Sequence, residues 1–66
     1  MDYEEFLEKV RATLEDEPEG LSWSQVRTKA GLPQKAPNNK WVRRLERDLG
    51  LKRSLVSGKG TIWRLR

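Results

Sequence analysis

Cysteine and histidine are both absent from this chain of 66 residues. Without cysteine there is no disulfide bond and no thiolate metal site, so side-chain packing alone must stabilise the fold. Without histidine the chain lacks the most frequent general base and the most frequent metal ligand of proteins. We therefore expect no metal site and no enzyme. Ser22 and Ser24, the nearest approach to a nucleophile, have no base partner in a recognisable motif.

Long apolar runs and a targeting segment are also missing. No stretch approaches the roughly 20 apolar residues that a membrane-spanning helix needs. The opening segment, residues 1–5, is acidic, which is the opposite of a signal or transit peptide. We expect an intracellular, cytoplasmic protein without membrane association. The length of the chain predicts a single domain over 1–66.

Acidic and basic residues are divided unequally along the chain: residues 1–20 have few bases, and residues 21–66 have few acids. Residues 1–20 hold eight acidic and two basic residues, a net charge of −6. Residues 21–66 hold twelve basic and two acidic residues, a net charge of +10. Such segregation orients a molecule toward a polyanion. Because solubility alone does not require segregated charge, the pattern favours a nucleic-acid partner.

Apolar residues at helical spacing predict an amphipathic helix over 3–16. The residues concerned are Tyr3, Phe6, Leu7, Val10 and Leu14. Pro18 and Gly20 should end this helix near Asp16. The polar faces are acidic, whereas a helix lying on a membrane surface would need basic ones. The apolar stripe is therefore expected to pack on the core.

A capping signal predicts a second helix over about 23–30. Ser22 can cap its first turn, and Gln25 three residues later can complete a capping box. Leu21 is expected to lie in a very short strand that leads into the helix. Gly31 fits the left-handed residue that ends many helices.

A third helix is expected over about 39–49, after a connector at 31–39. Asn38 or Asn39 is a suitable N-cap, and Gly50 should end the helix. The remaining sequence predicts two strands, at about 51–56 and 61–65, on either side of a flexible glycine-containing turn. The expected fold is α+β, in the order helix, short strand, helix, helix, strand, strand.

The third helix concentrates positive charge on one side. When successive residues are placed about 100° apart, the apolar residues gather on one side, and these are Trp41, Val42, Leu45 and Leu49. Four cations gather opposite, namely Lys40, Arg43, Arg44 and Arg47. Like charges three or four residues apart destabilise a helix by a few tenths of a kcal/mol per pair. Phosphate is a natural compensating group, and a solvated arginine-rich face is the alternative.

In this order the motifs resemble a winged helix-turn-helix domain. The similar features are the sequence 30–32 that ends the second helix, the sequence 49–51 that ends the third, and the hairpin that finishes on Trp63. The resemblance covers nearly the whole chain. The connector at 31–39 is longer than the usual turn of three or four residues, which leaves the angle between the helices open.

The resemblance implies a protein that binds double-stranded DNA. The third helix would enter the major groove, and the hairpin, as a wing over about 51–66, would contact backbone or minor groove. The expected DNA-binding residues are Ser24, Arg27, Lys35, Asn38, Asn39, Lys40, Arg43, Arg44, Arg47, Arg53, Lys59 and Arg64. The sequence does not separate base contacts from phosphate contacts.

Such a protein would be a regulator, or the DNA-binding module of a replication or mobile-element protein, cytoplasmic or nucleoid-associated. No cofactor and no small-molecule substrate are expected. A homodimer or a protein partner stays open. A protein-interaction winged helix is one alternative, although the sequence shows no large apolar patch for it.

A second alternative is a winged helix specific for Z-form duplexes. Lys35, Asn39 and Trp63 match the order and helix spacing of residues that such domains use. The tyrosine expected after the asparagine is Arg43 here, and the proline pair of the wing is replaced by Thr61 and Ile62. The three tryptophans are expected mainly to fill the small core, Trp41 and Trp63 more clearly than Trp23.

Overall fold

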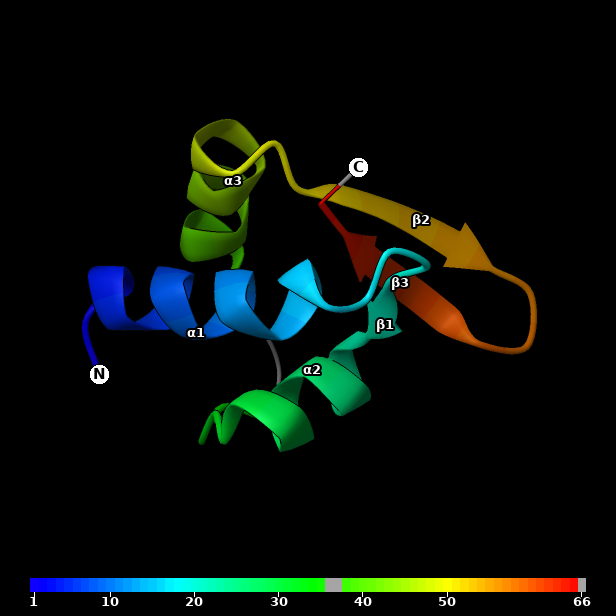
Figure 1. Ribbon diagram of the computed structural model, residues 1–66, viewed down its shortest axis with the longest axis horizontal. Helices are drawn as coiled ribbons and strands as arrows, with labels where there is room; N and C mark the ends of the chain where they lie inside the picture. Colours follow the sequence, from blue (N-terminus) through cyan, green and yellow to red (C-terminus); the bar gives the residue numbers. More distant parts are fainter. Residues whose placement is uncertain (36–37, 66) are drawn as a thin grey trace.

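The computed structural model describes residues 1–35 and 38–65. Residues 36–37 of the expected connector and Arg66 of the expected wing lie outside the described residues. The elements are α1 (Tyr3–Glu15), β1 (Leu21–Ser22), α2 (Trp23–Ala30), α3 (Asn39–Asp48), β2 (Lys52–Val56) and β3 (Gly60–Arg64) (Figure 1). The α+β order is confirmed, and the predicted ends differ from these by at most one residue.

The short polar motifs at the helix ends explain where the helices start and stop. The Ser22 hydroxyl accepts a hydrogen bond from the Gln25 amide at 3.3 Å, and the Gln25 side chain accepts one from the Ser22 amide at 3.0 Å. This is the predicted capping box, which satisfies two backbone donors. Gly31 adopts φ +69° at the end of α2. The predicted helix stop is therefore confirmed.

Asn38, rather than Asn39, caps α3. Its side-chain oxygen accepts hydrogen bonds from the amides of Lys40 and Trp41, at 3.0 and 3.3 Å. Two of the four amide groups that lack a partner inside the helix are thereby satisfied. α3 ends at its C-cap Leu49, directly before Gly50, as the sequence predicts.

The three strands form one antiparallel sheet in the order β1-β3-β2. The central strand, β3, places Trp63 opposite Leu21 of β1 on one side and opposite Arg53 of β2 on the other. The hairpin of β2 and β3 projects away from the three helices (Figure 1). It therefore has the form of a wing, and this hairpin is called the wing below.

The core draws a buried side chain from nearly every element. Its members are Tyr3, Phe6, Val10, Leu14, Leu21, Val26, Leu32, Val42, Leu45, Leu51 and Trp63. Trp63 is only 1% exposed, as expected for an inward strand residue. Trp23 and Trp41 are half-buried and pack at the edge of the core. The ring of Trp23 lies 5.0 Å from that of Trp63, and the ring of Trp41 lies 5.1 Å from that of Phe6.

Candidate nucleic-acid interface

The basic side of α3 faces solvent. Its apolar residues Val42 and Leu45 are 1% and 0% exposed, whereas the four cations on the other side are all exposed. Among the described residues, the α3 cation with a carboxylate oxygen within 4 Å is Arg47, which lies 3.4 Å from Asp48. The Arg47 side chain is still 74% exposed. Most of the positive charge on α3 is therefore not neutralised by ion pairs within the described residues.

Arg44 lies at the margin of this basic side. Its guanidinium carbon is 3.8 Å from the centre of the Tyr3 ring, so a cation–π contact holds it toward α1. The Tyr3 hydroxyl in turn donates a hydrogen bond of 2.8 Å to Asp48. This bond from Tyr3, helped by Arg47, lowers the pKa of Asp48, while burial and the neighbouring Asp48 carboxylate raise the pKa of Tyr3.

At the start of α3, three of the expected residues lie in different settings. Asn38 has its side-chain oxygen committed to the helix cap, whereas Asn39 is exposed in the first turn. Lys35 is exposed in the connector, and its backbone carbonyl accepts a hydrogen bond of 3.0 Å from the Trp23 indole. This bond joins the connector to the start of α2, twelve residues earlier.

The two arginines of the wing lie on opposite faces of the hairpin. Arg53 is paired with Trp63 across the strands, so Arg64 must point the other way, since successive strand residues alternate. Arg53 lies on the face turned toward the helices, 3.7 Å from Glu46 of α3 and 5.9 Å from the Trp63 ring centre. The structure therefore joins Arg53, but not Arg64, to the α3 side.

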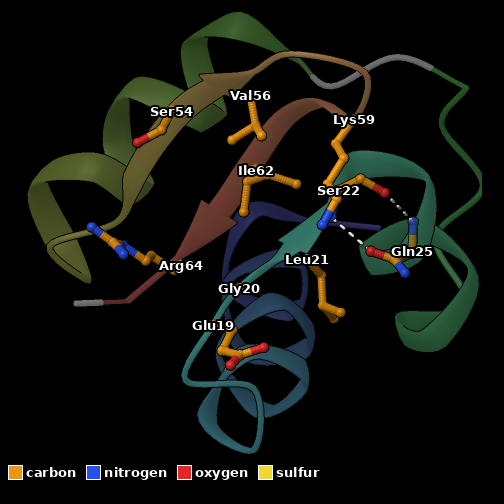
Figure 2. Close-up of a pocket in the computed structure, with 10 residues that line it drawn as sticks. All are labelled: Glu19, Gly20, Leu21, Ser22, Gln25, Ser54, Val56, Lys59, Ile62 and Arg64. Carbon is orange, nitrogen blue, oxygen red and sulfur yellow. Dashed lines mark hydrogen bonds between the residues drawn. The ribbon is translucent and has the colours of Figure 1, made fainter.

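Arg64 borders a hollow of about 610 Å³ on the outer face of the sheet (Figure 2). The lining residues are Glu19, Gly20, Leu21, Ser22, Gln25, Ser54, Val56, Lys59, Ile62 and Arg64. Figure 2 shows the Ser22–Gln25 capping bonds at its rim, so the polar groups there are already used by α2. The lining mixes one carboxylate, two cations and apolar groups, and it lies on the face turned away from α3.

A second hollow, of about 310 Å³, lies between the wing and the start of α2. Its lining residues are Ser22, Trp23, Ser24, Arg53, Lys59, Gly60, Thr61 and Trp63. It brings together three of the expected DNA-binding residues, Ser24, Arg53 and Lys59, which are distant in the sequence. Arg27, one turn further along α2, is half-buried and does not border this hollow.

Three acidic residues of 1–20 form ion pairs, namely Glu8, Glu15 and Glu17. Arg11 bridges Glu8 and Glu15 along α1, and Lys29 lies 2.8 Å from Glu17. These pairs use cations of α1 and α2 rather than those of α3 or the wing.

Comparison with protein-family models, with curated proteins and with solved structures finds no match to this chain. The topology is winged-helix-like. Three helices, a two-residue strand before α2 and a C-terminal hairpin that completes the sheet β1-β3-β2 form this arrangement. Within the described residues, no cluster of acidic side chains has the composition of a metal site. No helix in that part of the chain is long and apolar enough to span a membrane.

Sequence reasoning did not identify the partner of Glu46, and it missed Leu55. Glu46 contacts Arg53 of the wing, and the only available signal was that Glu46 and Asp48 are the sole acids after residue 20. Leu55 of β2 is 83% exposed, and nothing in the sequence distinguished it from a core residue. Both placements depend on the register of β2 against β3, which local sequence does not specify.

Proposed function

We propose that this domain binds double-stranded DNA, with α3 in the major groove and the wing on the neighbouring backbone and minor groove. The observation that supports it best is the open basic side of α3. There Lys40, Arg43 and Arg47 are exposed on the side opposite the core. Four cations on one helix face repel each other, and DNA phosphates relieve that repulsion.

The dimensions of the domain suit this arrangement. A helix with its side chains is about 10–12 Å in diameter, which fits a major groove about 12 Å wide, and the ten residues of α3 extend about 15 Å. The longest extent of the molecule is 31 Å, whereas the centres of a major groove and the next minor groove lie roughly 17 Å apart, half of a helical turn. A molecule of this size with α3 in one groove can reach the next with its wing.

The side chains divide into two proposed roles. Asn39, Lys40, Arg43 and Arg47 on α3 are the candidates for base edges, because arginine can fork onto guanine and asparagine onto adenine. Ser24, Arg53 and Lys59 border the hollow between α2 and the wing, and we assign them to contacts with the phosphate backbone. Arg64 is directed to the outer face, so we assign it a weaker contribution.

We also propose that binding proceeds without catalysis, cofactor or small-molecule substrate. The chain has no histidine and no cysteine, and the hydroxyl of Ser22 is engaged in the capping box. A regulator, or a module of a replication or mobile-element protein, is the context that this activity suggests.

Two alternatives are weaker on the structural observations. A protein-docking surface would need an apolar patch, but the exposed Leu55 and Val56 are adjacent in β2 and therefore point to opposite faces. A Z-form specialist would use Trp63, which is 1% exposed. A stoichiometric protein partner that survives nuclease treatment of the sample would favour the first alternative over DNA binding.

Duplex titration at several salt concentrations tests the proposal. With roughly four to seven phosphate contacts, a plot of log affinity against log salt should have a slope of about −4 to −6. The double variant Arg43→Gln/Arg47→Gln should bind weakly and discriminate less among duplex sequences, because both residues are assigned to base edges. Both residues are exposed, so the variant should fold normally.

The matched control is the double variant Lys9→Gln/Lys29→Gln. It also removes two positive charges, but neither belongs to α3. Lys9 lies in α1, and Lys29 of α2 is paired with Glu17. Its affinity should stay close to that of the parent. Absence of duplex binding at low salt would exclude the proposal, and equal losses in the two double variants would exclude α3 as the contact surface.

A further inference from the structure

Leu55 is the most exposed large apolar residue of the described chain, with 83% of its surface in contact with solvent. An isolated exposed leucine is ordinary on protein surfaces, so exposure alone carries no functional meaning. Its position in the wing is the informative feature, and it follows from the register of the hairpin.

The register places Leu55 on the face of the hairpin that is turned toward the helices. Leu55 is paired with Thr61, and Arg53 is paired with Trp63, so these four side chains share one face. Trp63 is buried in the core, whereas Leu55 lies two residues further out, about 6–7 Å along the strand. Leu55 therefore extends past the end of the core, on the face that holds Arg53.

The surroundings of Leu55 hold two cations and one carboxylate, a net positive charge. Arg53 precedes it by two residues on the same face, and Lys59 lies in the turn that follows. No acidic residue occurs after Asp48 in the sequence, and the nearby Glu46 is 3.7 Å from Arg53. An apolar side chain bordered by cations is complementary to a minor groove, whose sugar and base surfaces are apolar and whose edges are phosphates.

We propose that Leu55 inserts into the minor groove next to the site of α3 and bends the duplex. Apolar side chains such as leucine act in this way in minor-groove proteins, where they partly unstack one base step and kink the helix by about 20–90°. Arg53 and Lys59 hold the phosphates on either side of the inserted side chain. This inference rests on the proposed DNA binding and adds a local deformation to it.

Energy transfer between dyes at the two ends of a duplex tests the inference. The probe is a duplex of about 30 base pairs with alternating dT and dA, because its pyrimidine–purine steps are the most easily kinked. Saturating parent protein should raise the transfer efficiency. Leu55→Ser should remove most of that rise and weaken affinity about tenfold, since it keeps the cations but loses the wedge.

Val56→Ser is the matched control, because Val56 is the adjacent, exposed residue on the other face of β2. It should bend and bind the duplex as the parent does. Leu55→Met keeps a long apolar side chain and should retain the bend. Thermal unfolding should show that Leu55→Ser remains folded, since the removed side chain is almost wholly in solvent.

The outcomes separate this inference from the proposed function. If the parent binds the duplex but leaves energy transfer unchanged, the wedge is refuted while DNA binding stands. The same conclusion follows if Leu55→Ser bends DNA as well as the parent, or if Val56→Ser loses the bend equally. If the parent does not bind the duplex at low salt, both proposals fail.

Discussion

Gly20 precedes β1 at a point where a side chain has no space. Its φ is +86°, and a Cβ atom there would lie 2.6 Å from the carbonyl oxygen of Trp63 and 2.8 Å from Cγ2 of Ile62. The Trp63 oxygen belongs to the central strand of the sheet, so it cannot move without disturbing the pairing. Gly20→Ala should therefore destabilise the fold in two ways.

The matched variant is Gly31→Ala at the end of α2. Gly31 has a similar φ of +69°, but nothing lies within 4 Å of a Cβ atom there. It should lose only the left-handed backbone preference, about 1 kcal/mol. Gly20→Ala should lose this and a packing cost of about 1–3 kcal/mol. The total of about 2–4 kcal/mol is most of the stability of a domain this small, which is on the order of 3–5 kcal/mol.

Urea and thermal unfolding, followed by tryptophan fluorescence, measure the difference. One kcal/mol corresponds to about 4–8 °C in Tm for a domain of this size, so Gly31→Ala should melt about 4–8 °C below the parent. Gly20→Ala should melt at least about 8 °C below it, and about twice as far below it as Gly31→Ala or more. Equal losses in the two variants would show that the contact with the central strand is relieved at no cost, and the reasoning would be wrong.

Three further changes have definite expected outcomes. Asn38→Ala removes the cap of α3 and should lower the free energy of unfolding by about 1 kcal/mol, measured in urea; an unchanged midpoint would mean that water replaces the cap. Leu45→Ala, at a fully buried position, should cost about 2–5 kcal/mol and leave much of the chain unfolded at 25 °C, visible by circular dichroism. Because the pKa of Asp48 is lowered in the folded state, its contribution to stability is present above the unfolded pKa of about 4 and is lost as pH falls through the folded pKa. Tyr3→Phe removes the main cause, so its stability should decline less steeply in acid, and an identical pH profile would refute that assignment.

The sequence alone specified the local features of this domain. The capping box at Ser22 and the glycine at 31 fixed the ends of α2, because such motifs act between neighbours in the chain. The apolar period fixed which side of α3 is buried and which side carries its cations. These properties depend on interactions over one or two helical turns.

Tertiary structure alone decided how the basic residues are divided among surfaces. The register of β2 against β3 sent Arg53 and Leu55 to one face of the wing and Arg64 to the other. The approach of α1 to α3 turned Arg44 onto Tyr3, 41 positions away in the chain. A shift of one residue in strand pairing reverses every side chain of a strand, and no local pattern in β2 specifies that choice, because its residues are all exposed. The choice is made by Trp63, whose burial in the core fixes the face on which its strand partner lies.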